Sequence, residues 1–126
     1  MPSLPSLILL LTGVGFTGFG TAYALRPTAM AGLTDLTLPT ATARADFMAT
    51  YGGFQVGFGI FLIASARAED WLRPGLCAAI AALAGFASVR SLGIWFGRGI
   101  RGTIWIGLVI EIAALVANAW ALRHLS

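Results

Sequence analysis

The sequence is poor in the residues that build metal sites and disulfides. Its 126 residues include one cysteine, Cys77, and one histidine, His124. A single cysteine excludes a disulfide within the chain and a cysteine-based metal site. A single histidine excludes a bis-histidine haem or a three-histidine metal centre within one chain. We therefore predict no metal site and no cofactor held by such ligands.

Charged residues are also scarce. They make up 10% of the chain, lysine is absent, and all eight basic residues are arginines. The arginines lie mostly at the ends of apolar runs and form no basic run outside them. Despite the net charge of +3, this pattern argues against nucleic acid as a partner and favours anchoring in a membrane.

Apolar residues dominate what is present. They account for 58% of the chain, against roughly 45 to 50% in soluble domains. Four apolar segments are long enough to cross a bilayer as helices, and together they leave too little chain for a soluble domain. We predict a single integral membrane domain over residues 1–126 that is all-α, a four-helix transmembrane bundle with antiparallel up-down topology. The expected helices cover residues 4–25, 42–66, 75–96 and 102–122.

Small residues recur four positions apart on three of these segments, a spacing that allows membrane helices to approach closely. The rows are Gly13, Thr17 and Thr21, then Ala49, Gly53 and Gly57, and finally Ala113, Ala117 and Ala121. Such rows join helices within one chain or between chains, and contacts within the chain are the commoner use. We expect Gly13, Thr17, Gly53 and Gly57 at helix contacts.

Two ionisable residues lie well inside the last two segments. A charge at the centre of a membrane helix costs about 2.5 to 3.5 kcal/mol, so such residues usually have a partner. If the turn lies at Gly99, Arg90 and Glu111 differ in depth by three residues, or about 4.5 Å, which an arginine can span. We expect an ion pair that either fixes the register of the helices or serves as a ligand or proton site.

Further polar residues enter the same half of the membrane from the start of the second helix. They are Arg44, Asp46, Tyr51 and Gln55. Because the first and third loops share a side of the membrane, these residues could form one polar pocket with Arg90 and Glu111.

These residues also carry a resemblance. Residues 51–55 (Tyr-Gly-Gly-Phe-Gln), residues 90–93 (Arg-Ser-Leu-Gly), Gly97 and Glu111 occur in the order that resembles a bacterial membrane family known as domain of unknown function 4345. The resemblance implies a four-helix, multi-pass protein of the bacterial inner (cytoplasmic) membrane, distantly similar to DoxX-like proteins. The family often has an arginine where this chain has Met48, so an ionic role for the second helix is not implied.

The absence of a catalytic constellation predicts a protein that is not an enzyme. We expect a non-catalytic accessory or assembly subunit whose partners are the lipid bilayer and other membrane chains or a second copy of itself. One alternative is a small proton-coupled carrier that uses Glu111, with Arg90 modulating it. Another is a redox accessory that holds a bound lipid or quinone beside Tyr51, Gln55 and Arg90.

Overall fold

A computed structural model of the chain describes residues 1–125, which form helices and turns without a strand. In chain order the elements are α1 (Leu4–Leu25), α2 (Pro27–Gly32), α3 (Ala41–Phe47), the π-helix η1 (Met48–Gly53), α4 (Phe54–Arg67), α5 (Glu69–Phe96) and α6 (Gly102–Arg123). The predicted all-α fold is confirmed.

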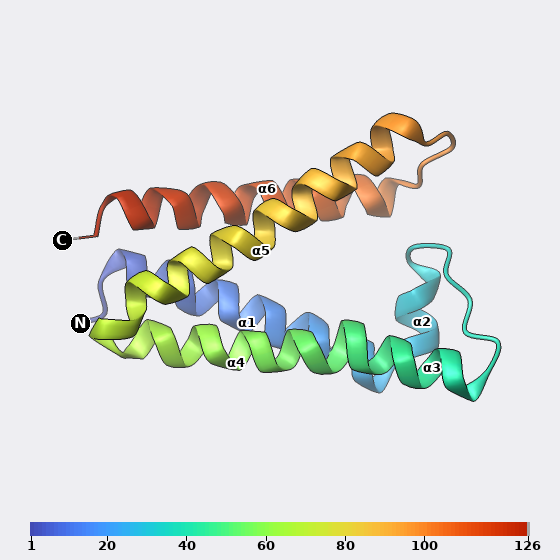
Figure 1. The fold of residues 1–126 in the computed structure, drawn as a ribbon, viewed down its shortest axis with the longest axis horizontal. Coiled ribbons are helices and arrows are strands. Elements are labelled where there is room, and N and C mark those ends of the chain that lie inside the picture. The colour runs from blue at the N-terminus through green and yellow to red at the C-terminus, as the bar shows by residue number, and fades with distance from the viewer. Residues whose placement is uncertain (126) are drawn as a thin grey trace.

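Four long helices lie alongside one another, with both chain ends at the same end of the molecule (Figure 1). They are α1, the continuous helix made of α3, η1 and α4, then α5 and α6, and each is long and apolar enough to cross a membrane. The 22 residues of α1 span about 33 Å, close to the roughly 30 Å of a hydrocarbon core. The 28 residues of α5 span about 42 Å, and this longer helix slants across its neighbours in Figure 1.

Local capping explains where the first two long helices begin. The Ser3 hydroxyl accepts a hydrogen bond from the backbone N–H of Ser6 at the start of α1. Thr40 does the same for Ala43 at the start of α3. Both side chains satisfy a backbone donor that the first turn of a helix leaves free.

The third long helix begins earlier than the sequence suggests. We expected it to start at residue 75, after a charged turn, but α5 starts at Glu69 and continues through Pro74. A proline near the start of a helix removes few hydrogen bonds, and membrane helices tolerate proline well. Glu69 and Asp70 fall in the first turn, where acidic side chains favour the positive end of the helix dipole.

Glycines bring α1 and α4 into close contact. A Cβ atom on Gly59 would lie 2.6 Å from the Thr17 backbone nitrogen and 2.7 Å from the Gly13 carbonyl oxygen. A Cβ on Gly20 would lie 2.8 Å from the Gly52 carbonyl oxygen. Later residues of α1 thus meet earlier residues of the second long helix, so these two helices run antiparallel.

Two glycines expected at helix contacts within the chain face outwards instead. A Cβ on Gly57 would have nothing within 4 Å, and on Gly53 it would meet only a carbonyl oxygen of its own helix, at 4.0 Å. The inner face of this helix carries Gly52 and Gly59, seven positions apart. The prediction chose the wrong row because helix rotation cannot be read from a regular spacing of four.

The hydrophobic core lies at the end of the bundle that holds both chain termini. Its largest buried members are Leu9, Leu62, Leu72 and Leu76, and Ala121 packs with them. At the opposite end, which we call the loop end, the hairpin of α5 and α6 diverges from α1 and α4 (Figure 1).

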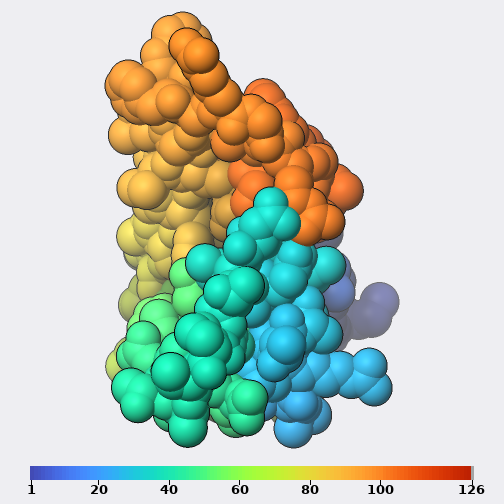
Figure 2. Space-filling view, turned by 90° about the vertical axis from the view of Figure 1, so that its right-hand side faces the viewer, coloured from blue at the N-terminus to red at the C-terminus, as the bar shows by residue number. Residues whose placement is uncertain are grey.

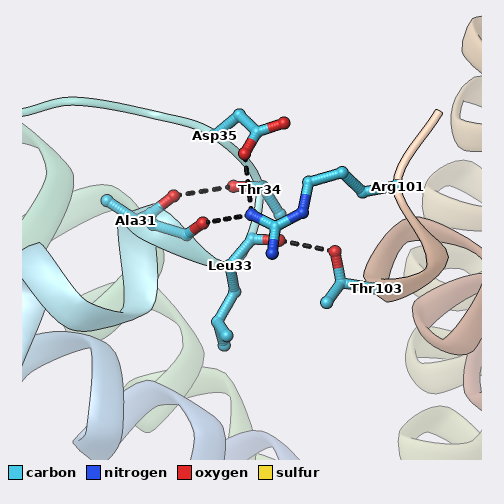
Figure 3. A network of polar contacts seen from close by, with 7 residues as sticks. Ala31, Leu33, Thr34, Asp35, Arg101 and Thr103 are labelled. Carbon is cyan, nitrogen blue, oxygen red and sulfur yellow. Dashed lines mark hydrogen bonds and ion pairs between the residues drawn. The ribbon is translucent and has the colours of Figure 1, made fainter. Parts of the chain in front are cut away.

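A polar contact closes the loop end. Arg101 Nη1 donates to the Gly32 carbonyl oxygen at 2.8 Å and to Asp35 Oδ1 at 2.7 Å, and the Thr103 hydroxyl donates to the Leu33 carbonyl oxygen (Figure 3). Figure 2, which looks at this end, shows the turn between α5 and α6 meeting the segment after α2. We call these contacts the loop latch. The connection between the first two long helices thus contains α2 and is tied to the hairpin.

Candidate functional site

Arg90 of α5 and Glu111 of α6 form the ion pair that their depths predict. Arg90 Nη2 donates to Glu111 Oε1 at 2.7 Å, and Arg90 Nε donates to Oε1 and Oε2 at 3.0 and 2.9 Å. This is the charge-assisted fork that a guanidinium makes with a carboxylate. The side chains are 28% and 14% exposed, so the hairpin ion pair, as we call it, is only partly buried.

A glycine in α6 makes room for the guanidinium. A Cβ on Gly107 would meet only guanidinium atoms of Arg90, at 3.7 to 3.9 Å. Gly107 lies one helical turn before Glu111, so the two residues share a face of α6. The same face continues to Asn118, which is fully buried. This face of α6 therefore points into the bundle.

One edge of the Arg90 guanidinium is not used by the ion pair. The group has five N–H donors, and its bonds to Glu111 come from Nε and Nη2. Nη1 forms no hydrogen bond with any residue in 1–125. In a bilayer, where water is scarce, a free donor of this kind favours a bound acceptor.

An aromatic cluster joins the last part of α1 to α3 and η1. The Tyr51 ring stacks on Phe47 at 4.7 Å between centroids, and Tyr23 of α1 lies 5.6 to 5.7 Å from both. Tyr51 is 40% exposed and belongs to η1, and π-helical turns occur frequently at functional sites. Tyr23 was not predicted as a site residue, since a lone tyrosine near a helix end gives no signal of its own.

The other residues of the predicted pocket do not bond to the hairpin ion pair. Gln55 is partly buried at the contact with α1, where its Cβ lies close to Gly20. Arg44 and Asp46 are exposed on α3. Within the part of the chain that the structure describes, none of these three side chains bonds to Arg90 or Glu111. The structure thus leaves the charged residues of α3 at the surface.

A second polar contact inside the bundle joins α6 to α1. Asn118 Nδ2 donates to Thr12 Oγ1 at 2.9 Å and to the Ala114 carbonyl oxygen at 2.8 Å, while its Oδ1 has no partner among residues 1–125. Polar side chains that bond across membrane helices stabilise their packing. Nothing in the sequence indicates that Thr12 is the partner of Asn118.

The described residues do not form a candidate metal centre. No group of three histidine, cysteine or acidic side chains that could hold an ion occurs among residues 1–125, and Cys77 is exposed on α5. The polar chemistry of the hairpin ion pair therefore comes from the Arg90 guanidinium and the Glu111 carboxylate alone.

Comparison with known proteins identifies the family. The profile of the family described as "Domain of unknown function (DUF4345)" matches residues 5–122, which include the hairpin ion pair, Tyr51 and all four long helices except the first residue of α1 and the last of α6. No curated protein and no solved structure matches the chain. The chain is a multi-pass membrane protein built on four apolar helices, and it belongs to the DUF4345 family.

Proposed function

We propose that the chain is a non-catalytic accessory or assembly subunit that packs against another membrane protein chain in the bacterial inner membrane. The observation that carries the proposal is the outer face of the second long helix. Ala49, Gly53 and Gly57 form a row there, and all three are exposed. A row of small residues on a membrane helix is the usual place for a second helix to approach closely.

The inner face of the same helix shows what such a row does in this chain. Gly52 and Gly59 bring its backbone against α1, with a Cβ at either position lying 3.0 Å or less from atoms of α1. The outer row likewise has no large side chains, so a neighbouring helix could approach its backbone as closely. Lipid can cover any exposed apolar side chain, so the large apolar residues at the surface are not informative. The exposed glycines do indicate a protein contact, because a surface that faces only lipid does not require small residues.

The polar contacts within the bundle support a packing role. The hairpin ion pair joins α5 to α6, Asn118 joins α6 to α1, and the loop latch joins the hairpin to α2. These contacts fix the outer surface of the bundle before a partner arrives. A rigid surface loses less conformational entropy on binding, which favours association.

Copurification from native membranes in mild detergent tests the proposal. Gly57→Leu places a large side chain on the outer row and should remove the partner chain. Gly85→Leu on α5 is the matched control, since Gly85 is also exposed with nothing within 4 Å of a Cβ atom. We expect the control to keep the partner. A wild-type chain that copurifies with no other membrane protein, or equal behaviour of the two variants, would contradict the proposal.

A proton-coupled carrier that works through Glu111 stays the second candidate. The Glu111 side chain is 14% exposed, so it is not sealed inside the bundle. Both carboxylate oxygens accept from Arg90, so protonation has to weaken that fork. A carrier cycle would therefore alternate between a paired and an unpaired Arg90.

A further inference from the structure

We propose that the loop latch is a release point, and that the hairpin of α5 and α6 swings away from α1 and the second long helix when the latch opens. The hairpin then hinges at the end of the bundle that holds both chain termini. The inference goes beyond the packing role and does not depend on it. Four observations carry it: where the hairpin is buried, what holds its tip, how stiff the tip is, and the backbone of Asp35.

Burial confines the firm packing of the hairpin to one end. On α5 the last buried residue is Ala87, and on α6 the first is Leu108. Residues 88–107, which we call the hairpin tip, include no buried residue. At the opposite end of the hairpin, Leu76 and Ala121 belong to the hydrophobic core. Segments with few buried apolar contacts open at a lower free energy than the core does.

The loop latch holds the hairpin tip against the rest of the bundle (Figure 3). Within residues 1–125, the hydrogen bonds and ion pairs that join the tip to the first two long helices and their connection are those of Arg101 and Thr103 with Gly32, Leu33 and Asp35. The Arg101 and Asp35 side chains are 47% and 67% exposed, so water and salt compete for their charges. Such a contact can open while the core stays folded.

The hairpin is braced at both ends, so it moves as one body. Near the tip, Arg90 Nη2 donates to Glu111 Oε1 at 2.7 Å and joins α5 to α6. At the far end, Asn118 Nδ2 donates to Thr12 Oγ1 of α1 at 2.9 Å and fixes the hairpin to the bundle. The start of α6 at Gly102 lies about 24 Å from Asn118 along the axis, so a hinge rotation of about 10° moves the tip by about 4 Å.

The backbone of Asp35 gives independent support for a switch at this place. Within residues 1–125, Asp35 is the non-glycine residue with a positive φ, 60°. It follows α2, where the Leu36 N–H donates to the Ala31 carbonyl oxygen at 3.0 Å. Glycine is the usual residue at such a left-handed helix end, because it has no Cβ. Aspartate adds the ion pair with Arg101 instead, and uncommon backbone conformations concentrate at switch regions.

Double electron–electron resonance on the full chain in lipid nanodiscs tests the proposal. The exposed Cys77 is first replaced by alanine. Spin labels on Arg98→Cys in the hairpin turn and Asp46→Cys on α3, both exposed positions, measure the distance from the tip to the second long helix. A second pair on Arg67→Cys and Arg123→Cys, at the ends of α4 and α6, measures the terminus end in the same way.

Removing the latch donors should release the tip. In the double variant Arg101→Gln, Thr103→Val we expect a second population at least about 4 Å longer for the first label pair, and an unchanged distance for the second pair. The longer population should also grow in the wild-type latch when salt rises from about 0.01 M to about 1 M, because the ion pair is exposed. Arg26→Gln, which changes an exposed arginine outside the latch, is the control and should match the wild-type latch.

Three results would overturn the proposal. If the double variant keeps the wild-type distance, packing and not the latch holds the tip. If the wild-type latch already shows the distribution of the double variant at low salt, the latch holds nothing. If both label pairs move apart in the double variant, the whole bundle has loosened and no hinge exists at the terminus end.

Discussion

Removing one partner of the hairpin ion pair should cost more stability than removing both. In Glu111→Met the guanidinium loses its only partner among the described residues and cannot shed its proton. Breaking a buried pair in this way costs about 3 to 5 kcal/mol, and the 28% exposure of Arg90 places the expected loss near the lower value. Arg90→Met should cost less, about 2 kcal/mol, because a carboxylate can take up a proton.

The double variant Arg90→Met, Glu111→Met tests whether the two side chains stabilise each other. Methionine fills similar space without charge, so we expect the double variant to lie within about 1 kcal/mol of wild type. Unfolding by sodium dodecyl sulfate in mixed micelles, followed by far-ultraviolet circular dichroism, gives the four free energies of the cycle. If the loss in the double variant equals the sum of the single losses, the two side chains do not interact and the reasoning from their geometry is refuted.

Three further predictions concern other parts of the bundle. Gly59→Ala should destabilise the chain by about 1 to 3 kcal/mol in the same assay, because its Cβ would overlap the α1 backbone, whereas Gly57→Ala should change stability little; equal effects would contradict the packing described for α1 and α4. Arg101→Gln should cost less than about 1 kcal/mol, and less again at high salt, since the partners in the loop latch are 47% and 67% exposed; a larger, salt-independent loss would show that the latch is a main source of stability. Glu111→Gln should abolish pH-dependent uptake in proteoliposomes if the chain is a proton-coupled carrier, and unchanged uptake would remove Glu111 from that mechanism.

Residue depth could be predicted from the sequence, but helix rotation could not. The hairpin ion pair was predictable because a short turn fixes how far Arg90 and Glu111 lie from it, and an arginine spans the remaining difference. The Gly107 position beneath the guanidinium and the Thr12 partner of Asn118 depend on which way each helix faces. That direction is set by packing against all the other helices at once, so no single segment encodes it.

The second long helix shows the same limit most clearly. Its sequence offered the regular row of Gly53 and Gly57, but Gly52 and Gly59 make the contact with α1. The π-helix η1 lies between the start of this helix and Gly59. A π-helical turn holds more residues than an α-helical turn, so the side chains before it are rotated about the helix axis relative to the side chains after it. A pattern of apolar residues does not reveal such a turn, and Arg44 and Asp46 were placed near the ion pair for the same reason.

The loop latch also bears on how the chain is made. The carbonyl oxygens of Gly32 and Leu33 at the end of α2 accept from Arg101 and Thr103, which are synthesised about 70 residues later. During translation α2 is among the first elements to leave the ribosome, yet its last turn gains these donors only after α5 and the start of α6 have been produced. The end of α2 therefore reaches its final contacts only when the last hairpin is in the membrane, which makes this short helix a natural reporter of completed insertion.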